Sequence, residues 1–143
     1  KLVRGGLFPQ AWVRNAQQQM QLSDEALGDN LTLVGFAADP LSTLSPEQVF
    51  AWIKLGGSFL HIGACGQRPV GDCVFIEDLN HAILPLVPRA TLVVVRPDRH
   101  IMHHLPGPQA AELVQSCLAL MACDNSTAES VSITISAPPR LRA

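Results

Sequence analysis

The chain has 143 residues and a mass of 15.4 kDa, which is enough for one domain with its own hydrophobic core. A formal net charge of −2 gives no electrostatic reason to expect binding to nucleic acid or to an anionic membrane, and no apolar run approaches the roughly 18 residues that span a bilayer. Charged residues make up 15% of the chain, against roughly 25% in an average soluble domain, which indicates an additional buried face against another domain or subunit.

Residues 1–20 have no clean hydrophobic period and combine glycines and a proline with a run of glutamines. We interpret them as a connecting arm, extended around residues 7–13, that leads into a domain spanning residues 21–143. The first strand of that domain is predicted at Leu31–Ala37, because a short and nearly continuous apolar run is typical of a strand covered on both faces.

The segment Ser45–Gln48 has the composition of a helix start. Serine can cap the first turn, proline suits the first helical position, and glutamine can reach back to the cap. The predicted helix covers Pro46–Leu55 and ends at a pair of glycines. It is expected to bury Val49, Phe50 and Ile53.

The next elements are two apolar pieces separated by a glycine-rich loop. A strand is predicted at Ser58–Ala64, and a shorter extended piece around Val74–Ile76. A helical turn is expected within Leu79–Leu86, where prolines stop it from extending. The apolar run Ala90–Val95 is predicted as a further strand.

The segment Arg96–Arg99 has turn chemistry, because proline and aspartate are placed to reverse the chain, so His100–His104 is predicted to return as the second strand of a hairpin. Ser130–Ser136 alternates as a half-buried strand. A helix from Gly107 to about Met121 is predicted between them, since six apolar residues form one stripe at helical spacing: Ala110, Leu113, Val114, Cys117, Leu118 and Met121. The sum, β-α-β, a β-hairpin and a helix, is the element order of a thioredoxin-like α/β domain with an additional C-terminal strand.

Three histidines lie within the predicted returning strand. Side chains alternate along a strand, so His100 and His104 should share one face with Met102, while His103 points to the other face. Only two of them can then meet one ion, no carboxylate or cysteine adjoins them, and zinc sites use three or four protein ligands. We therefore expect hydrogen-bonded or solvated histidines here and no metal site.

The chain has four cysteines: Cys65, Cys73, Cys117 and Cys123. None forms a C-x-x-C pair and no secretory segment precedes them, so reduced thiols in a cytoplasmic protein are expected. A thioredoxin-type enzyme needs a low-pKa cysteine at the turn from its first strand into its first helix, and the corresponding residues 38–45 contain none. Cys65 follows the second predicted strand instead, where Arg68 could lower the pKa of its thiol.

Other catalytic and nucleotide-binding signatures are absent from the sequence. It has no G-x-S-x-G elbow, no phosphate-binding P-loop and no G-x-G pair. The adjacent acids Asp24-Glu25 and Glu77-Asp78 are typical of solvated turns. We therefore assign no catalytic, cofactor-binding or metal-ligating residue in this chain.

Three segments have a familiar order and spacing: Gly6–Val13, Leu22–Gly35 and Leu92–Ile101. Together they resemble the C-terminal domain of the FAD-dependent aromatic hydroxylases, the group that contains 3-(3-hydroxyphenyl)propionate hydroxylase and relatives of phenol hydroxylase. In that family a G-x-h-x-P-Q segment leads out of the substrate-binding domain. An L-x-D-x-L-G turn then enters the first strand of a thioredoxin-like domain, and an R-P-D-R-Y/H-V turn closes its hairpin.

The resemblance covers roughly residues 5–122. The sequence departs from the family pattern at residues 77–86, which lack the usual glycine and tryptophan, and at Ser130–Ser136, which goes beyond the expected domain.

The resemblance implies that catalysis takes place in upstream FAD and substrate domains of the same chain. The fragment itself would bind no cofactor, while the parent protein would use FAD, NAD(P)H and oxygen to hydroxylate an aromatic ring. The domain would pack against those upstream domains and supply contacts in a homo-oligomer. Candidates for interface residues are exposed apolar and arginine positions of the hairpin and the N-terminal arm, such as Phe8, Trp12 and Arg99.

Two other hypotheses stay open. The chain could be a stand-alone thioredoxin-like protein that handles thiols or peroxides with Cys65, or a free-standing interaction module. Neither nucleic acid nor a membrane is an expected partner, and a cytoplasmic location is expected under each hypothesis.

Overall fold

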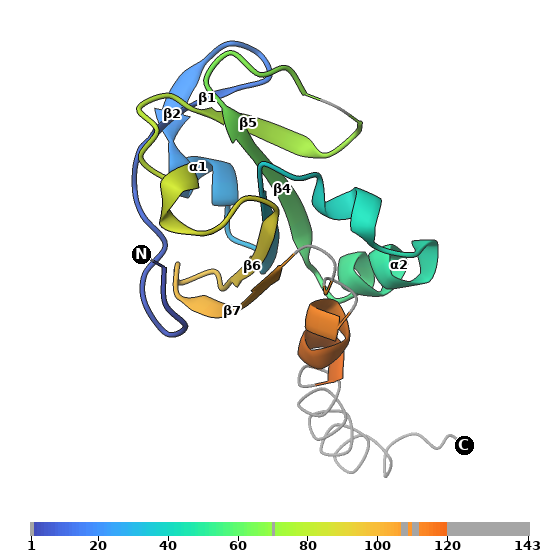
Figure 1. Ribbon diagram of the computed structural model, residues 1–143. Helices are drawn as coiled ribbons and strands as arrows, with labels where there is room; N and C mark the ends of the chain where they lie inside the picture. The colour runs from blue at the N-terminus through green and yellow to red at the C-terminus, as the bar shows by residue number, and fades with distance from the viewer. Residues whose placement is uncertain (1, 70, 107–108, 110–111, 120–143) are drawn as a thin grey trace, which may run out of the picture.

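The computed structural model of the protein describes residues 2–69, 71–106, 109 and 112–119 (Figure 1). Within them a seven-stranded sheet has the order β2-β1-β5-β4-β3-β6-β7. The strands are β1 Trp12–Asn15, β2 Met20–Leu22, β3 Thr32–Phe36, β4 Ser58–Ala64, β5 Val74–Asp78, β6 Thr91–Val95 and β7 Ile101–Pro106. The helical elements are α1 Ser23–Leu27, η1 Pro40–Thr43, α2 Pro46–Lys54, η2 Leu84–Leu86 and a helix over residues 112–119.

Three parallel strands, β3, β4 and β5, form the centre of the sheet, and antiparallel pairs extend it on both sides. The predicted β-α-β unit is confirmed as β3-α2-β4, and the predicted hairpin as β6-β7. Residues 12–15 fall in the segment interpreted as a connecting arm, yet they form β1. Their partners lie far along the sequence, as in the pair of Val13 with Asp78, so only the folded sheet makes this segment a strand.

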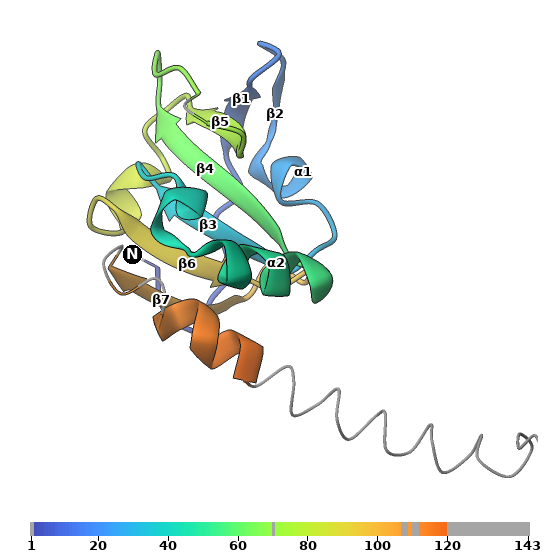
Figure 2. The same ribbon diagram turned by 90° about the vertical axis from the view of Figure 1, so that its right-hand side faces the viewer.

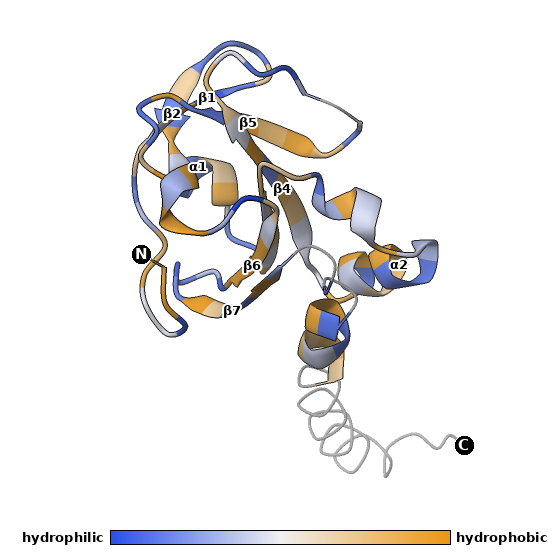
Figure 3. Cartoon of the chain, viewed as in Figure 1, coloured by the Kyte–Doolittle hydropathy of each residue, from blue (hydrophilic) through white to orange (hydrophobic). Residues whose placement is uncertain are grey.

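Each face of the sheet carries its own hydrophobic cluster. One cluster combines Val34, Ile62 and Val93 from the central strands with Leu2 and Phe8 from the N-terminal segment. The other is covered by α2 and the helix over residues 112–119, which lie in front of the sheet in Figure 2. Hydrophobic residues accordingly concentrate in the central strands, whereas the loop between β1 and β2 is hydrophilic (Figure 3). Among the described residues, no helix is long and apolar enough to cross a bilayer.

The start of α2 agrees with the prediction. The Ser45 hydroxyl accepts a hydrogen bond from the Gln48 backbone N–H at 3.2 Å, and the Gln48 side chain accepts one from the Ser45 N–H at 3.0 Å. Pro46 occupies the first turn. This reciprocal pairing satisfies two backbone donors that the helix itself cannot satisfy.

The predicted buried face of α2 is wrong for two of its three residues, Phe50 and Ile53, whereas Val49 is half-buried. Phe50 and Ile53 are 68% and 56% exposed, whereas Trp52 is fully buried. The Trp52 indole N–H donates to the Ser58 carbonyl at 2.9 Å. A methyl group at Gly57 would overlap the indole ring, so glycine at this position makes the room. Burial of Trp52, whose indole N–H is hydrogen-bonded, therefore determines which face of α2 packs on the sheet.

The remaining elements agree in part with the prediction. The turn expected within Leu79–Leu86 is the shorter η2, and the backbone before it is held by the Asp78 carboxylate, which accepts hydrogen bonds from three successive N–H groups at 2.8–3.0 Å. In the C-terminal helix, Leu113, Val114 and Cys117 are buried, as the stripe predicted. Ala110, Met121 and the predicted strand Ser130–Ser136 lie outside the described residues.

We expect Trp52→Ala to lower the free energy of unfolding by about 3–5 kcal/mol, because it removes the largest buried side chain and leaves a cavity. Phe50→Ala, in the same helix, should change it by less than about 0.5 kcal/mol. Urea denaturation of both variants measures the difference. Equal losses would contradict the assignment of the buried face.

Candidate functional site

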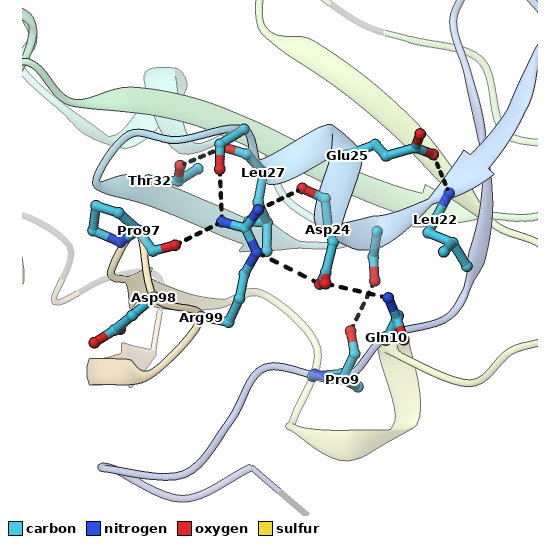
Figure 4. Close-up of polar contacts among 12 residues, drawn as sticks. Pro9, Gln10, Leu22, Asp24, Glu25, Leu27, Thr32, Pro97, Asp98 and Arg99 are labelled. Atoms are coloured by element: carbon cyan, nitrogen blue, oxygen red, sulfur yellow. Dashed lines mark hydrogen bonds and ion pairs between the residues drawn. The ribbon is translucent and has the colours of Figure 1, made fainter.

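The three segments that carry the motifs meet at one corner of the fold, around Arg99 (Figure 4). Arg99 closes the turn between β6 and β7, where its N–H donates to the Arg96 carbonyl at 2.9 Å and the Arg96 N–H donates to the His100 carbonyl at 2.9 Å. Its φ of 73° lies in the left-handed region, which residues other than glycine rarely adopt. The turn therefore has a strained residue at its end, and the contacts of that residue hold it there.

The guanidinium of Arg99 reaches the end of α1. One Nη donates to the Gly28 carbonyl at 2.6 Å, the other donates to the Asp24 carbonyl at 3.0 Å, and Nε lies 3.6 Å from the Asp24 carboxylate. The last carbonyls of a helix have no partner within it, and a cation placed there satisfies them. Arg99 thus fixes α1 against the hairpin (Figure 4).

The N-terminal segment completes the corner. The Phe8 N–H donates to the Arg99 carbonyl at 2.7 Å, and the Gln10 side chain donates to the Asp24 carboxylate at 3.2 Å. Ser23 at the start of α1 donates through its hydroxyl to the Pro9 carbonyl at 2.8 Å. We call these residues, Phe8, Pro9, Gln10, Ser23, Asp24, Gly28 and Arg99, the Arg99 junction.

Two of the three residues proposed for an interface, Phe8 and Arg99, make contacts within the domain instead. Phe8 is buried, with its ring edge-on against Phe36 at a centroid distance of 6.0 Å, so it belongs to the core. The Arg99 side chain is 23% exposed and hydrogen-bonded within the domain. Trp12 is 49% exposed. Because the polar groups of the junction pair with one another, the arrangement holds segments together and presents no nucleophile.

The histidine stretch forms part of β7, where His103 and His104 face opposite sides as predicted, but His104 does not share a face with Met102. The pairing passes from Val95–Ile101 directly to Val94–His103, so Met102 is an extra residue in a β-bulge. His103 therefore faces the same side as Val94, and His104 the opposite side. The described residues contain no group of three or more metal-ligating side chains.

The turn after β3 occupies the place where a thioredoxin-type enzyme carries its reactive cysteine. Nearby, Cys73 is half-buried, and burial together with the charge of Asp39 raises the pKa of its thiol to about 12. Burial also lowers the pKa of His61, which is 3% exposed and has no hydrogen-bond partner within the described residues. Cys117 is buried, which raises its pKa to about 11. Cys73 and Cys117 are therefore protonated at neutral pH and unreactive as nucleophiles.

Cys65 lies exposed just after β4, and it has a cationic neighbour that the sequence did not indicate, Arg14. The guanidinium of Arg14 lies 4.0 Å from the Cys65 sulfur and donates two hydrogen bonds of 3.1 Å to Glu77. The Gly66 N–H donates to the same carboxylate at 2.9 Å. A cavity of about 570 Å³ opens beside these groups. Glu77, expected on a solvated turn, is instead 5% exposed and paired.

Sequence reasoning missed the contact between Arg14 and Glu77 because it assigned Arg14 to an arm and Glu77 to a turn. The two residues are neighbours only through the pairing of β1 with β5. The same is true of Asp78, which is 1% exposed and binds backbone N–H groups rather than solvent. Residues 12–15, Trp-Val-Arg-Asn, do not alternate between apolar and polar side chains, so no local pattern indicated β1.

We expect Arg99→Ala to lower the free energy of unfolding by about 2 kcal/mol, because it leaves the carbonyls of Asp24 and Gly28 without their charged donor. Arg99→Lys should recover only part of the loss, since an ammonium group lacks the planar fork. The control is Arg96→Ala in the same turn, whose exposed ion pair with Asp98 should contribute less than about 1 kcal/mol. Denaturant unfolding distinguishes them, and an equal effect of both alanines would refute the role of the junction.

The ion pair of Glu77 with Arg14 should make the free energy of unfolding depend on pH in the acidic range. Its hydrogen bonds from Arg14 and from the Gly66 N–H hold the pKa of Glu77 below its ordinary value near 4.5. The unfolded chain therefore takes up the proton first, so this contribution is present above that value and is lost as the pH falls through the folded pKa. The Glu77→Gln variant should be less stable than the wild type at neutral pH, but it should lose less stability than the wild type as the pH falls. Denaturant unfolding at several pH values measures both effects. The same substitution at exposed Glu47 is the control, and an unchanged acid dependence in Glu77→Gln would contradict the prediction.

Comparison with known proteins identifies relatives of the whole described domain. The model of a family described as the HcaD C-terminal domain matches residues 5–120. A 3-(3-hydroxy-phenyl)propionate/3-hydroxycinnamic acid hydroxylase of Burkholderia cenocepacia is 29% identical in an alignment of 135 positions that covers 87% of this chain and 25% of that protein. The corresponding enzyme of Paraburkholderia xenovorans is 27% identical in an alignment of 145 positions, gaps included, that covers 95% of this chain and 23% of that protein. The chain thus spans about a quarter of the length of these curated relatives.

Solved structures confirm the thioredoxin-like fold. A thiol:disulfide interchange protein DsbE of Chlorobium tepidum superposes with a TM-score of 0.63 at 11% identity, covering 85% of this chain and 99% of that one. The flavin-dependent monooxygenase PieE superposes with a TM-score of 0.60 at 20% identity, covering 83% of this chain but only 20% of that one. The sequence match extends over the segments that build the Arg99 junction and over every strand of the sheet. The chain belongs to the family of HcaD C-terminal domains.

Proposed function

We propose that this chain is the non-catalytic C-terminal domain of an aromatic-ring hydroxylase that uses FAD and NAD(P)H, and that it contributes stability and subunit contacts to that enzyme. The observation that carries the proposal is the match of the chain to a family of C-terminal domains and to about a quarter of the length of enzymes named as hydroxylases. The place of the thioredoxin-type cysteine adds support, because the turn there contains Asp39 and Pro40 and no thiol.

The described residues do not fit FAD. Dinucleotide sites use a glycine-rich turn between a strand and a helix, where backbone N–H groups face the pyrophosphate. Here β3 leads through Ala37 and Ala38 to Asp39, whose carboxylate would repel a pyrophosphate and already accepts the Leu41 N–H at 2.9 Å. In the proposed enzyme, flavin and nicotinamide therefore bind to domains outside this chain, and no residue of this chain acts on the ring.

The Arg99 junction supports a structural role. It ties residues 8–10, through which the chain enters the domain, to both α1 and the hairpin. Chain arriving from an upstream domain would therefore be fixed to the C-terminal domain by hydrogen bonds rather than joined by a loose linker. The homo-oligomer, the cytoplasmic location and the contacts with upstream domains belong to the same proposal.

A second candidate function is favoured by one contact. The exposed thiol of Cys65 lies 4.0 Å from the Arg14 guanidinium, and a neighbouring cation can stabilise a thiolate. A stand-alone thiol- or peroxide-handling protein would use this group. Glu77 weakens that hypothesis, because it accepts two hydrogen bonds from the same guanidinium and compensates its charge.

The deciding experiment is the intact mass and visible absorption spectrum of the protein isolated from its native cells. The proposal expects a protein several times heavier than 15.4 kDa with the yellow colour of a bound flavin. A colourless protein near 15.4 kDa would contradict it. Turnover of thiol or peroxide substrates, compared between the wild type and Cys65→Ser, then tests the second candidate; the proposal expects no turnover in either.

A further inference from the structure

The outer face of α2 is apolar at its centre and charged at its ends. Phe50 and Ile53 are 68% and 56% exposed, while Trp52 on the opposite side of the helix packs on the sheet. Glu47 in the first turn and Lys54 in the last turn are exposed as well. A fold that leaves an aromatic ring uncovered beside its most buried tryptophan has a surface suited to a partner.

This apolar region extends beyond the helix. Val74 at the start of β5 is 59% exposed, and a groove of about 380 Å³ separates it from α2. The groove is lined by apolar side chains that include Leu41, Val49 and Phe59. We define the α2 surface as Glu47, Phe50, Ile53, Lys54 and Val74.

The α2 surface faces away from the point where the chain enters the domain. Leu2 donates its N–H to the Leu86 carbonyl at 3.4 Å and packs in the cluster on one face of the sheet, whereas α2 covers the other face. The N-terminus and α2 accordingly lie on opposite sides of the molecule in Figure 1. Upstream domains that join the chain at its N-terminus would meet Val3 and Leu7, which are exposed there, rather than α2.

The charges of α2 fit a second copy of the same helix. Glu47 and Lys54 are seven positions apart, about two helical turns, so they lie on the same side of the helix, and Phe50 lies midway between them. When two α2 helices cross antiparallel about a two-fold axis near Phe50, Glu47 of each copy faces Lys54 of the other. A parallel pair would instead bring like charges together, and it would also align the two helix dipoles unfavourably.

We propose that the α2 surface pairs two copies of this domain in an antiparallel, two-fold symmetric contact centred on Phe50. The proposal deepens the proposed function, on which it rests, by naming the surface that supplies the subunit contact. Phe50 and Ile53 supply the burial of apolar area, and the two Glu47–Lys54 pairs select the antiparallel orientation. A helix of nine residues is about 13.5 Å long. Its contact is smaller than the roughly 800 Å² per partner of a standard interface, so this chain alone associates weakly.

The test is sedimentation velocity over a wide range of concentrations, with amide chemical shifts recorded over the same series. The wild type should sediment faster as its concentration rises, with the largest shift changes at Glu47–Lys54. Phe50→Asp should remain monomeric. Glu47→Lys and Lys54→Glu should each raise the dissociation constant about ten-fold, because each replaces two attractive pairs by two repulsive ones. The double variant Glu47→Lys/Lys54→Glu should restore association, since the opposite charges again face each other.

Met20→Asp is the matched control, because Met20 is 63% exposed but lies on β2, away from α2. Retained circular dichroism and tryptophan fluorescence show that each variant is folded. Association that persists in Phe50→Asp, or that the double variant fails to restore, would overturn the α2 contact while leaving the proposed function standing. Absence of any concentration-dependent change in the wild type would also overturn it. The mass and colour of the native protein decide the proposed function independently.

Discussion

The guanidinium of Arg99 joins parts of the chain that the sequence keeps far apart. It donates to the carbonyls of Asp24 and Gly28 at the end of α1, while the carbonyl of Arg99 accepts the N–H of Phe8. Arg99 itself is held with a positive φ, so the turn and the junction depend on each other. A lysine could supply the charge but not several donors in one plane. This gives a physical reason why the R-P-D-R turn of this chain accompanies the helix segment at residues 22–28.

Sequence reasoning succeeded where local chemistry decides the structure. The strands β3 and β6 are mainly apolar runs buried on both faces, and the start of α2 follows from Ser45, Pro46 and Gln48 alone. The predictions failed where a residue far away in the sequence determines the local structure. The rotation of α2 depends on Ser58 and Gly57 receiving the Trp52 indole, and the faces of β7 depend on a bulge at Met102. Neither the contact of Trp52 with Ser58 nor the bulge at Met102 can be recognised from the pattern of neighbouring residues in the sequence.

The same division applies to the candidate site. The three motif segments can be read from the sequence, but their contacts cannot, because Gln10, Asp24 and Arg99 meet only after the sheet has formed. The contact between Arg14 and Glu77 was even harder to predict from the sequence. They form a partly buried ion pair across two strands, and the sequence shows each only as an isolated charge. The spacing of residues in a sequence motif is enough to recognise a segment. An ion pair between two strands can be predicted only when the register of those strands is known.

The turn after β3 contains no cysteine, and this changes what α2, the helix that follows it, can do. In a redox enzyme the start of that helix must stay open to substrates, because the reactive thiolate lies there. Here η1 and the Asp39 carboxylate occupy that end, and Cys73 nearby remains protonated. With no reactive cysteine at this turn, an exposed aromatic residue on α2 such as Phe50 does not obstruct a substrate site there. The missing cysteine and the exposed apolar residues of α2 are therefore both consistent with the proposal that this helix is a contact surface.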